Sequence, residues 1–106
     1  MFTLIYCTCP DAACAENIAR HLVSQHLAAC VNILPGVTSI YAWQGEIETA
    51  GEHLLLIKTG SELFDQVSAA IKSLHPYEVP EIIAVAIDKG SPDYLHWIKS
   101  CLMSAL

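Results

Sequence analysis

The chain has few basic residues and no long apolar run, and each absence excludes a class of partner. Its 106 residues carry 5 lysines and arginines against 11 acidic residues, which gives a formal net charge of −6 at pH 7. The bases are scattered, so the chain lacks the basic face that binds nucleic acid or anionic lipid. Pure apolar runs such as IIAVAI and LLLI fall well short of the roughly 20 residues that span a membrane. We predict no nucleic-acid partner and no membrane partner.

Sequence signatures of common enzymes are also missing. The chain contains no G-x-S-x-G elbow, no glycine-rich phosphate loop and no H-E-x-x-H. Arg20 is the only arginine, and it falls within a predicted helix, where a surface charge is the simplest interpretation. A nucleophilic pair of Cys7 and His75 lacks an evident oxyanion stabiliser. We predict that the protein is not an enzyme.

The opening segment MFTLIYCTC has neither the basic leader nor the small-residue cleavage site of a secretory signal. We therefore expect a cytoplasmic protein. The chain has 5 cysteines, and an odd number in a reducing compartment favours free thiols over a disulfide framework.

The length and the apolar content predict one domain that meets another subunit. A chain of 106 residues suits a single domain over residues 1–106. Apolar residues make up 54% of it, which is high for a chain whose surface is large relative to its volume. Some of that apolar surface is expected to contact a second copy.

Hydrophobic periodicity predicts alternating strands and helices. The segments are a strand over 2–9, a helix from Asp11, a strand over 28–43 with a bulge at Pro35-Gly36, a turn-like link over 44–52, a strand over 53–59, a helix from Thr59 or Ser61 to Pro76, a strand over 81–88 and a helix over 91–106. Thr59 and Glu62 have capping-box spacing, and the run EIIAVAID is typical of a strand buried on both faces.

This order predicts an α+β fold, a ferredoxin-like βαββαβ sandwich with an extra C-terminal helix. Helices cover one face of its sheet, and the other face is left for a partner. Right-handed crossovers bring the end of the first strand, with Cys7 and Cys9, to the same end of the sheet as His75 and Trp43. Cys7 and His75 are therefore expected to be neighbours in space.

The cysteine-rich stretch CTCPDAAC has C-x-C-x4-C spacing, which matches no structural zinc motif. Cys7 and Cys9 share one strand face about 7 Å apart and so could hold a soft ion together. The simpler interpretation is that Cys9, Cys14, Cys30 and Cys101 serve as small apolar residues. Cys7 with His75 suits copper or zinc, although a third ligand is needed. The alternative for His75 is a structural role at the helix end.

The other candidate ligands have weaker support. His21, His26, His53 and His96 lack a partner at a suitable spacing and are expected at the solvated surface. Glu78 and Glu81 could supply carboxylates to a hard ion, but the prolines around them favour a rigid connection. The tyrosines and tryptophans exceed what one small core hides, so we expect some at an interface.

Four stretches together resemble one family. These are CTCPD, LAACVNILPGVTSIYAWQGEIE, LHPYEVPEI and YLHWI, and they are similar to the CutA divalent-cation tolerance proteins over nearly the whole chain. The resemblance implies a cytoplasmic homotrimer of ferredoxin-like subunits that acts in tolerance of divalent cations, copper above all.

The resemblance also implies metal ligands. In bacterial members, copper ligation has been assigned to a cysteine that ends the first strand and to two adjacent histidines before the Pro-Tyr motif. Carried over, these positions are Cys7, Leu74 and His75, so one histidine is replaced by leucine. Leu74 instead fits the apolar stripe of its helix.

Two hypotheses follow. The first is a protein of divalent-cation tolerance that binds copper or another divalent cation through Cys7 and His75. The second is a trimeric signalling or scaffold module, similar to the nitrogen-regulatory proteins, that binds a small molecule or a protein at subunit clefts. Leu74 favours the second, because losing a histidine weakens ligation without harming a trimer.

Overall fold

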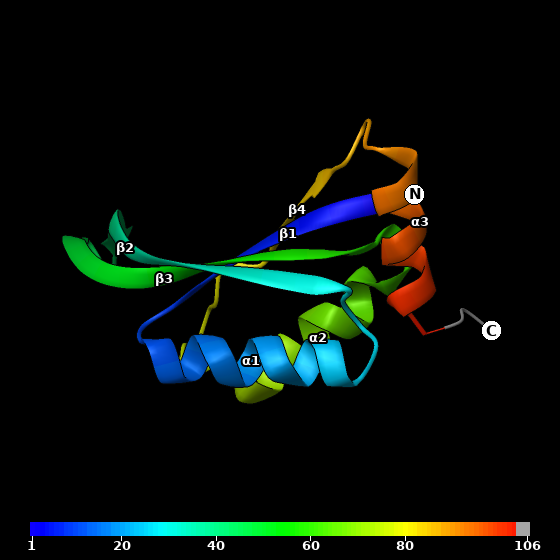
Figure 1. The fold of residues 1–106 in the computed structure, drawn as a ribbon. Helices are drawn as coiled ribbons and strands as arrows, with labels where there is room; N and C mark the ends of the chain where they lie inside the picture. The colour runs from blue at the N-terminus through cyan, green and yellow to red at the C-terminus, as the bar shows by residue number, and fades with distance from the viewer. Residues whose placement is uncertain (104–106) are drawn as a thin grey trace.

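The computed structural model describes residues 1–103 and shows an α+β fold with a four-stranded sheet and three α-helices (Figure 1). Its elements are β1 (Phe2–Cys9), α1 (Ala12–Ser24), β2 (Cys30–Trp43), β3 (Glu46–Gly60), the 3-10 turn η1 (Ser61–Leu63), α2 (Phe64–Leu74), β4 (Ile83–Ala86) and α3 (Pro92–Cys101). The order of strands and helices agrees with the predicted order. The last helix was predicted to reach residue 106, but it ends at Cys101, and residues 104–106 lie outside the described part.

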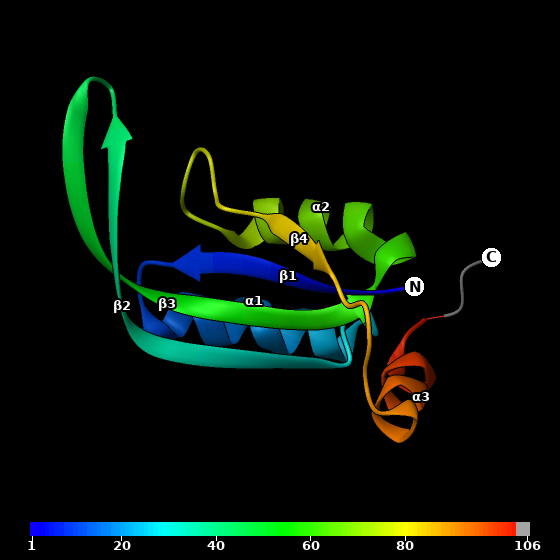
Figure 2. The same cartoon turned by 90° about the horizontal axis from the view of Figure 1, so that it is seen from above.

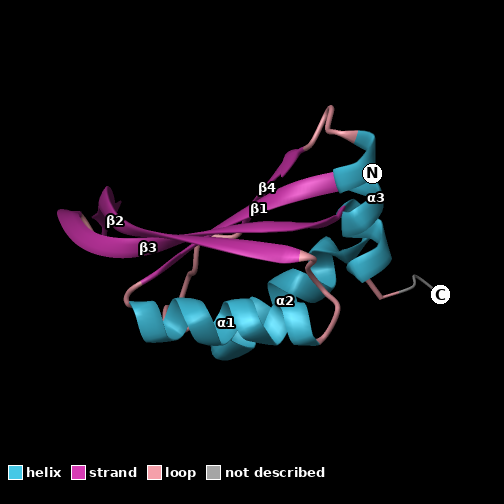
Figure 3. Ribbon diagram, in the orientation of Figure 1, coloured by secondary structure: helices cyan, strands magenta, loops and turns pink. Residues whose placement is uncertain are grey.

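The sheet has the order β2-β3-β1-β4, and every neighbouring pair is antiparallel. Helices α1 and α2 lie on the same face of this sheet, while α3 lies at one end of it (Figures 1 and 3). The opposite face has no helix packed along it in the described part of the chain. No helix of residues 1–103 is long and apolar enough to cross a membrane.

The core lies between the sheet and the two helices on that face. Alternate residues of β1 point toward α1 and α2 and are wholly buried, as the period of two along a strand requires. The core residues are Ile5, Cys7, Cys9, Ala15, Ile18, Leu22, Ala28, Leu55, Ile57, Leu63, Val67 and Ile71. Cys7 and Cys9 are thus part of the core as well as candidate ligands.

Helix α1 begins where the sequence predicted it. The carboxylate of Asp11 accepts a hydrogen bond from the backbone N–H of Cys14 at 2.8 Å, which satisfies one of the free amides of the first turn. This cap fixes the path of the chain between Cys9 and Cys14, and it brings the start of α1 close to the end of β1.

The predicted link over 44–52 is wrong, because β3 begins at Glu46 and the turn is only Gln44-Gly45. Both turn residues have positive φ, 50° and 82°, which is typical of a two-residue hairpin turn. The hairpin of β2 and β3 is therefore a long arm that extends past the rest of the sheet (Figure 2). The predicted irregularity at Pro35-Gly36 is confirmed by a register shift between Leu34 and Val37.

Two local predictions around the second half of the chain are also wrong. Thr59 does not cap a helix, because it lies within β3 and its hydroxyl donates to the carbonyl of Leu27 at 2.6 Å. Strand β4 covers only Ile83–Ala86, and all of it is exposed rather than buried on both faces. The predicted start of the last helix is confirmed, because Ser91 is the N-cap residue of α3, although its side chain makes no capping hydrogen bond.

Candidate functional site

The structure brings Cys7 and His75 together, as the topology argument predicted. Cys7 lies near the end of β1, and His75 is the residue that follows α2. The ligand atoms of Cys7, Cys9 and His75 all lie within 4.8 Å of one another, and the three side chains are buried. The residues come from positions nearly seventy apart in sequence, and two of them were singled out from the sequence.

His75 is held by two hydrogen bonds to the backbone. Its Nε2 lies 2.7 Å from the carbonyl oxygen of Thr8, so Nε2 carries the proton and donates, because a carbonyl can only accept. Its Nδ1 accepts from the backbone N–H of Tyr77 at 3.1 Å. The ring also packs against the Tyr77 ring, with centroids 4.6 Å apart. The imidazole therefore joins the exit of α2 to the end of β1.

Cys9 belongs to the same cluster, although the simpler interpretation of the sequence is that it serves as a small apolar residue. The alternation along β1 was the available signal, because it places Cys9 on the same face as Cys7. The pKa of the Cys9 thiol lies well above its usual range. The largest cause is a hydrogen bond with the Cys7 thiol, and the second is burial. Cys9 is therefore a neutral thiol at physiological pH when no ion is bound.

Cys14 lies at the outer side of this cluster and is half-buried. The pKa of Cys14 is raised to about 12, mainly by burial and secondly by a hydrogen bond with the Cys9 thiol. Cys14 therefore contacts Cys9 but is not among the residues whose ligand atoms converge. Cys30 and Cys101 are also half-buried free thiols and take no part in the cluster.

The donor set fits a soft or borderline ion. Two thiols and an imidazole are ligands that copper and zinc prefer, whereas calcium and magnesium require oxygen donors. Both ring nitrogens of His75 already hold backbone hydrogen bonds, so an ion has to replace one of them. Leu74, at the position of the missing histidine, packs against the core. It is thus a structural residue here.

The remaining histidines only partly follow the prediction of a solvated surface. His26 and His96 are not buried, and His21 is half-buried. His53 does not follow the prediction, because it is half-buried and its Nδ1 is covered and has no hydrogen-bond partner among the described residues. Its backbone pairs with Cys9 across β1 and β3, in the interior of the sheet. His53 is therefore largely covered because it lies in a central strand, even though its side chain is polar.

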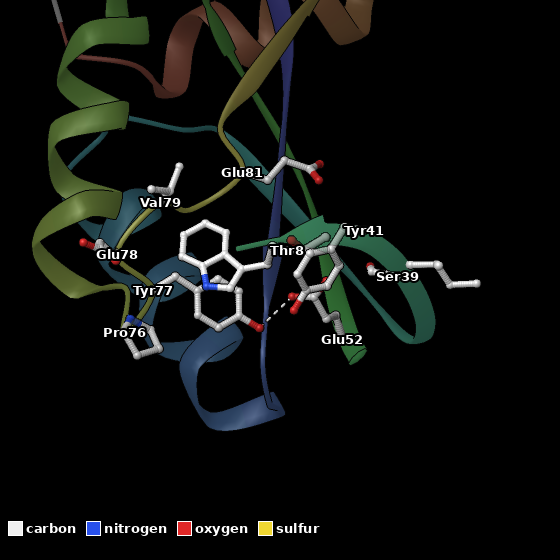
Figure 4. A pocket seen from close by; sticks show the side chains of 11 residues that line it. Thr8, Ser39, Tyr41, Glu52, Pro76, Tyr77, Glu78, Val79 and Glu81 are labelled. Carbon is white, nitrogen blue, oxygen red and sulfur yellow. Dashed lines mark hydrogen bonds between the residues drawn. The ribbon is translucent and has the colours of Figure 1, made fainter. Parts of the chain in front are cut away.

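A pocket of about 670 Å³ lies between the arm and the connection that follows α2 (Figure 4). Its lining residues are Thr8, Ser39, Ile40, Tyr41, Trp43, Glu52, Pro76, Tyr77, Glu78, Val79 and Glu81. The Tyr77 hydroxyl donates to Oε2 of the buried Glu52 at 2.7 Å. Burial, followed by this hydrogen bond, raises the pKa of Tyr77. Glu78 and Glu81 lie in the connection between α2 and β4, as the sequence favoured, and they also line this acidic and aromatic pocket.

The helix-free face of the sheet and the arm expose large apolar side chains. Val85 pairs with Leu4 and Ile83 with Tyr6, so these side chains share the face opposite the core. Ile83 and Val85 are 54% and 51% exposed, and Ile40 and Ile47 on the arm are 70% and 80% exposed. Large exposed apolar side chains are common on surfaces that contact another protein chain.

Comparison with known proteins identifies one family. The family model "CutA1 divalent ion tolerance protein" matches residues 3–101. Protein CutA of Mus musculus is 48% identical over 93 residues, which cover 88% of this chain but 52% of the mouse protein. The divalent-cation tolerance protein CutA of Thermus thermophilus is 48% identical over 99 residues, which cover 93% of this chain and 96% of that protein.

A solved structure matches equally well. The divalent cation tolerance protein (Cut A1) from Thermus thermophilus superposes with a TM-score of 0.95 and 46% sequence identity. The match covers 97% of this chain and 100% of that one, so the arm and the connection around the pocket are included in the shared fold.

Proposed function

Because the chain belongs to the CutA1 divalent ion tolerance family, we propose that it acts in the tolerance of divalent cations and binds copper or another divalent cation through Cys7 and His75. The observation that carries this proposal is the convergence of their buried donor atoms within 4.8 Å. Relatives are named as tolerance proteins rather than as enzymes, and we propose a role without catalysis.

The proposal includes the assembly. We propose one ferredoxin-like domain over residues 1–106 that forms a homotrimer in the cytoplasm. The strand order β2-β3-β1-β4 supports the fold assignment. The exposed apolar residues of β4 and of the arm support a subunit interface on the helix-free face. The free state of all 5 cysteines is consistent with a reducing compartment.

Titration of Cu²⁺ and Zn²⁺ into the purified protein tests the metal site. We expect Cys7→Ala and His75→Ala each to weaken binding by about tenfold or more, because each removes a donor from a small ligand set. Cys30→Ala and His96→Ala are matched controls, since both residues lie outside the cluster. Unchanged affinity in both ligand variants would remove the site.

A second candidate function rests on the pocket. The buried carboxylate of Glu52, with Glu78, Glu81 and the surrounding aromatic rings, suits a small molecule or a peptide side chain that carries positive charge.

A thermal-shift screen of organic cations, such as polyamines and guanidinium compounds, tests this candidate. We expect a binder to raise the melting temperature of the wild type, and Glu52→Gln to weaken its affinity at least about tenfold by removing a charged hydrogen-bond acceptor. Gln has nearly the same size as Glu, so Glu52→Gln should leave the fold unchanged, and a weaker affinity then reports the loss of the charge. If no cation shifts the melting temperature, this function is rejected.

A further inference from the structure

We propose that Cys9 is the third ligand of the metal site and that Cys7, Cys9 and His75 together bind monovalent copper, with the two sulfurs as the main donors. The inference rests on the proposed function in one respect, namely that an ion occupies this cluster. It adds the missing ligand, which comes from the same chain, and the oxidation state of the ion.

The spacing of the two sulfurs permits a shared ion. Cys7 and Cys9 alternate along β1, and both side chains point into the core. Their sulfurs lie within 4.8 Å of each other. An ion about 2.3 Å from each of two sulfurs spans at most about 4.6 Å between them. Small side-chain adjustments therefore suffice for both sulfurs to bind one ion.

The sulfurs are also freer to bind than the imidazole. The Cys7 thiol has a long contact of 3.9 Å with the carbonyl of Thr8 and a hydrogen bond with the Cys9 thiol. In contrast, both nitrogens of His75 hold shorter hydrogen bonds, of 2.7 and 3.1 Å. An ion that binds the sulfurs displaces their protons but breaks no short hydrogen bond to the backbone, whereas an ion that binds the ring breaks one. The ring then completes the site as the weaker third donor.

The number and kind of donors select the ion. Thiolates favour monovalent copper and zinc, while divalent copper favours a planar set of nitrogen and oxygen ligands. Zinc takes four ligands in almost all structural sites, but only three donors converge in the described chain, and all are buried. Monovalent copper is the soft ion that remains, and low coordination suits it.

Burial and the nearby Glu52 carboxylate disfavour a charged thiol at Cys9, so the bound ion itself has to supply most of the compensating positive charge. Each thiol that binds the ion loses its proton to solvent, so a site with two thiolates and one monovalent ion carries one negative charge. Helix α1 begins at Ala12, three residues after Cys9, with Asp11 as its N-cap, and the partial positive charge of that helix end favours an anion. Cys14 is half-buried and contacts Cys9.

Anaerobic competition titration tests the inference, with Cu⁺ supplied from its coloured complex with bicinchoninate. We expect one Cu⁺ per chain and a loss of affinity of about a hundredfold or more in Cys9→Ala, because even groups that only support a ligand are worth 10-fold to 100-fold. Cys9→Ser keeps the size of the side chain and should show the same loss. Cys101→Ala is the matched control and should bind as the wild type does.

X-ray absorption at the copper edge of the loaded protein gives an independent readout, and two sulfur neighbours are expected. If Cys7→Ala and His75→Ala weaken binding while both Cys9 variants bind normally, Cys9 is not a ligand, and the proposed function stands without this inference. If Zn²⁺ or Cu²⁺ binds more tightly than Cu⁺, the assigned oxidation state is wrong. If no ion binds to the wild type, the proposed function fails as well.

Discussion

Val85→Lys is expected to convert the proposed trimer into monomers. Val85 lies on the edge strand β4, is 51% exposed, and points to the helix-free face of the sheet together with Leu4. A lysine there places a charge in an apolar interface, and threefold symmetry repeats the cost in every subunit. The result is measured by sedimentation velocity at micromolar concentration, where the wild type should sediment as a trimer.

Val23→Lys is the matched control for this experiment. Val23 is 41% exposed, but it lies on α1, on the helix-covered side of the sheet. The same substitution there should leave the trimer intact. A wild type that sediments as a monomer would contradict the proposed assembly. A trimeric Val85→Lys protein would instead show that the interface lies elsewhere.

His75→Ala should lower the free energy of unfolding by about 2–4 kcal/mol, apart from any effect on metal binding. The substitution removes the donor to the carbonyl of Thr8, which is buried, and it leaves the N–H of Tyr77 without its acceptor. It also opens a cavity between the end of β1 and the exit of α2. Urea denaturation without metal, at one fixed protein concentration, measures the change.

Two further variants separate this effect from the general loss of a histidine. His96→Ala should change stability by less than about 0.5 kcal/mol, because His96 lies at the surface. His75→Asn keeps a donor and an acceptor on a smaller side chain, so it should recover part of the loss. An equal loss in His75→Asn and His75→Ala would show that packing, and not the hydrogen bonds, holds this junction.

The sequence was sufficient to predict the order of the elements, the family and the meeting of Cys7 with His75. Family membership, inferred from the four quoted stretches, is confirmed. Periodicity identifies elements that pack within one chain, such as α1, whose buried residues follow the helical repeat. Handedness of the crossovers then fixes which strand ends share an edge of the sheet.

The wrong predictions concern segments that lie outside the core of their own chain. The apolar run that contains β4 was predicted to be buried, but an apolar run looks the same whether its own chain or another copy covers it. The start of β3 was taken for a turn because Glu46 and Glu48 are polar, and a projecting arm has no core to impose an apolar face. The interpretation of Cys9 as a small apolar residue agrees with its place in the core, but a buried thiol serves equally well as an apolar residue and as a ligand.

The position of β1 in the sheet has a consequence for the newly made protein. β1 is synthesised before the other described elements, yet its partners are β3 and β4, and Thr3 pairs with Ala86, more than 80 positions further along the sequence. Cys7 and Cys9 thus remain uncovered until α2 and His75 have been synthesised and have folded back. During that interval the thiols are open to oxidants and to free metal ions. The protein's own biosynthesis is therefore the stage at which its thiols most need a reducing environment.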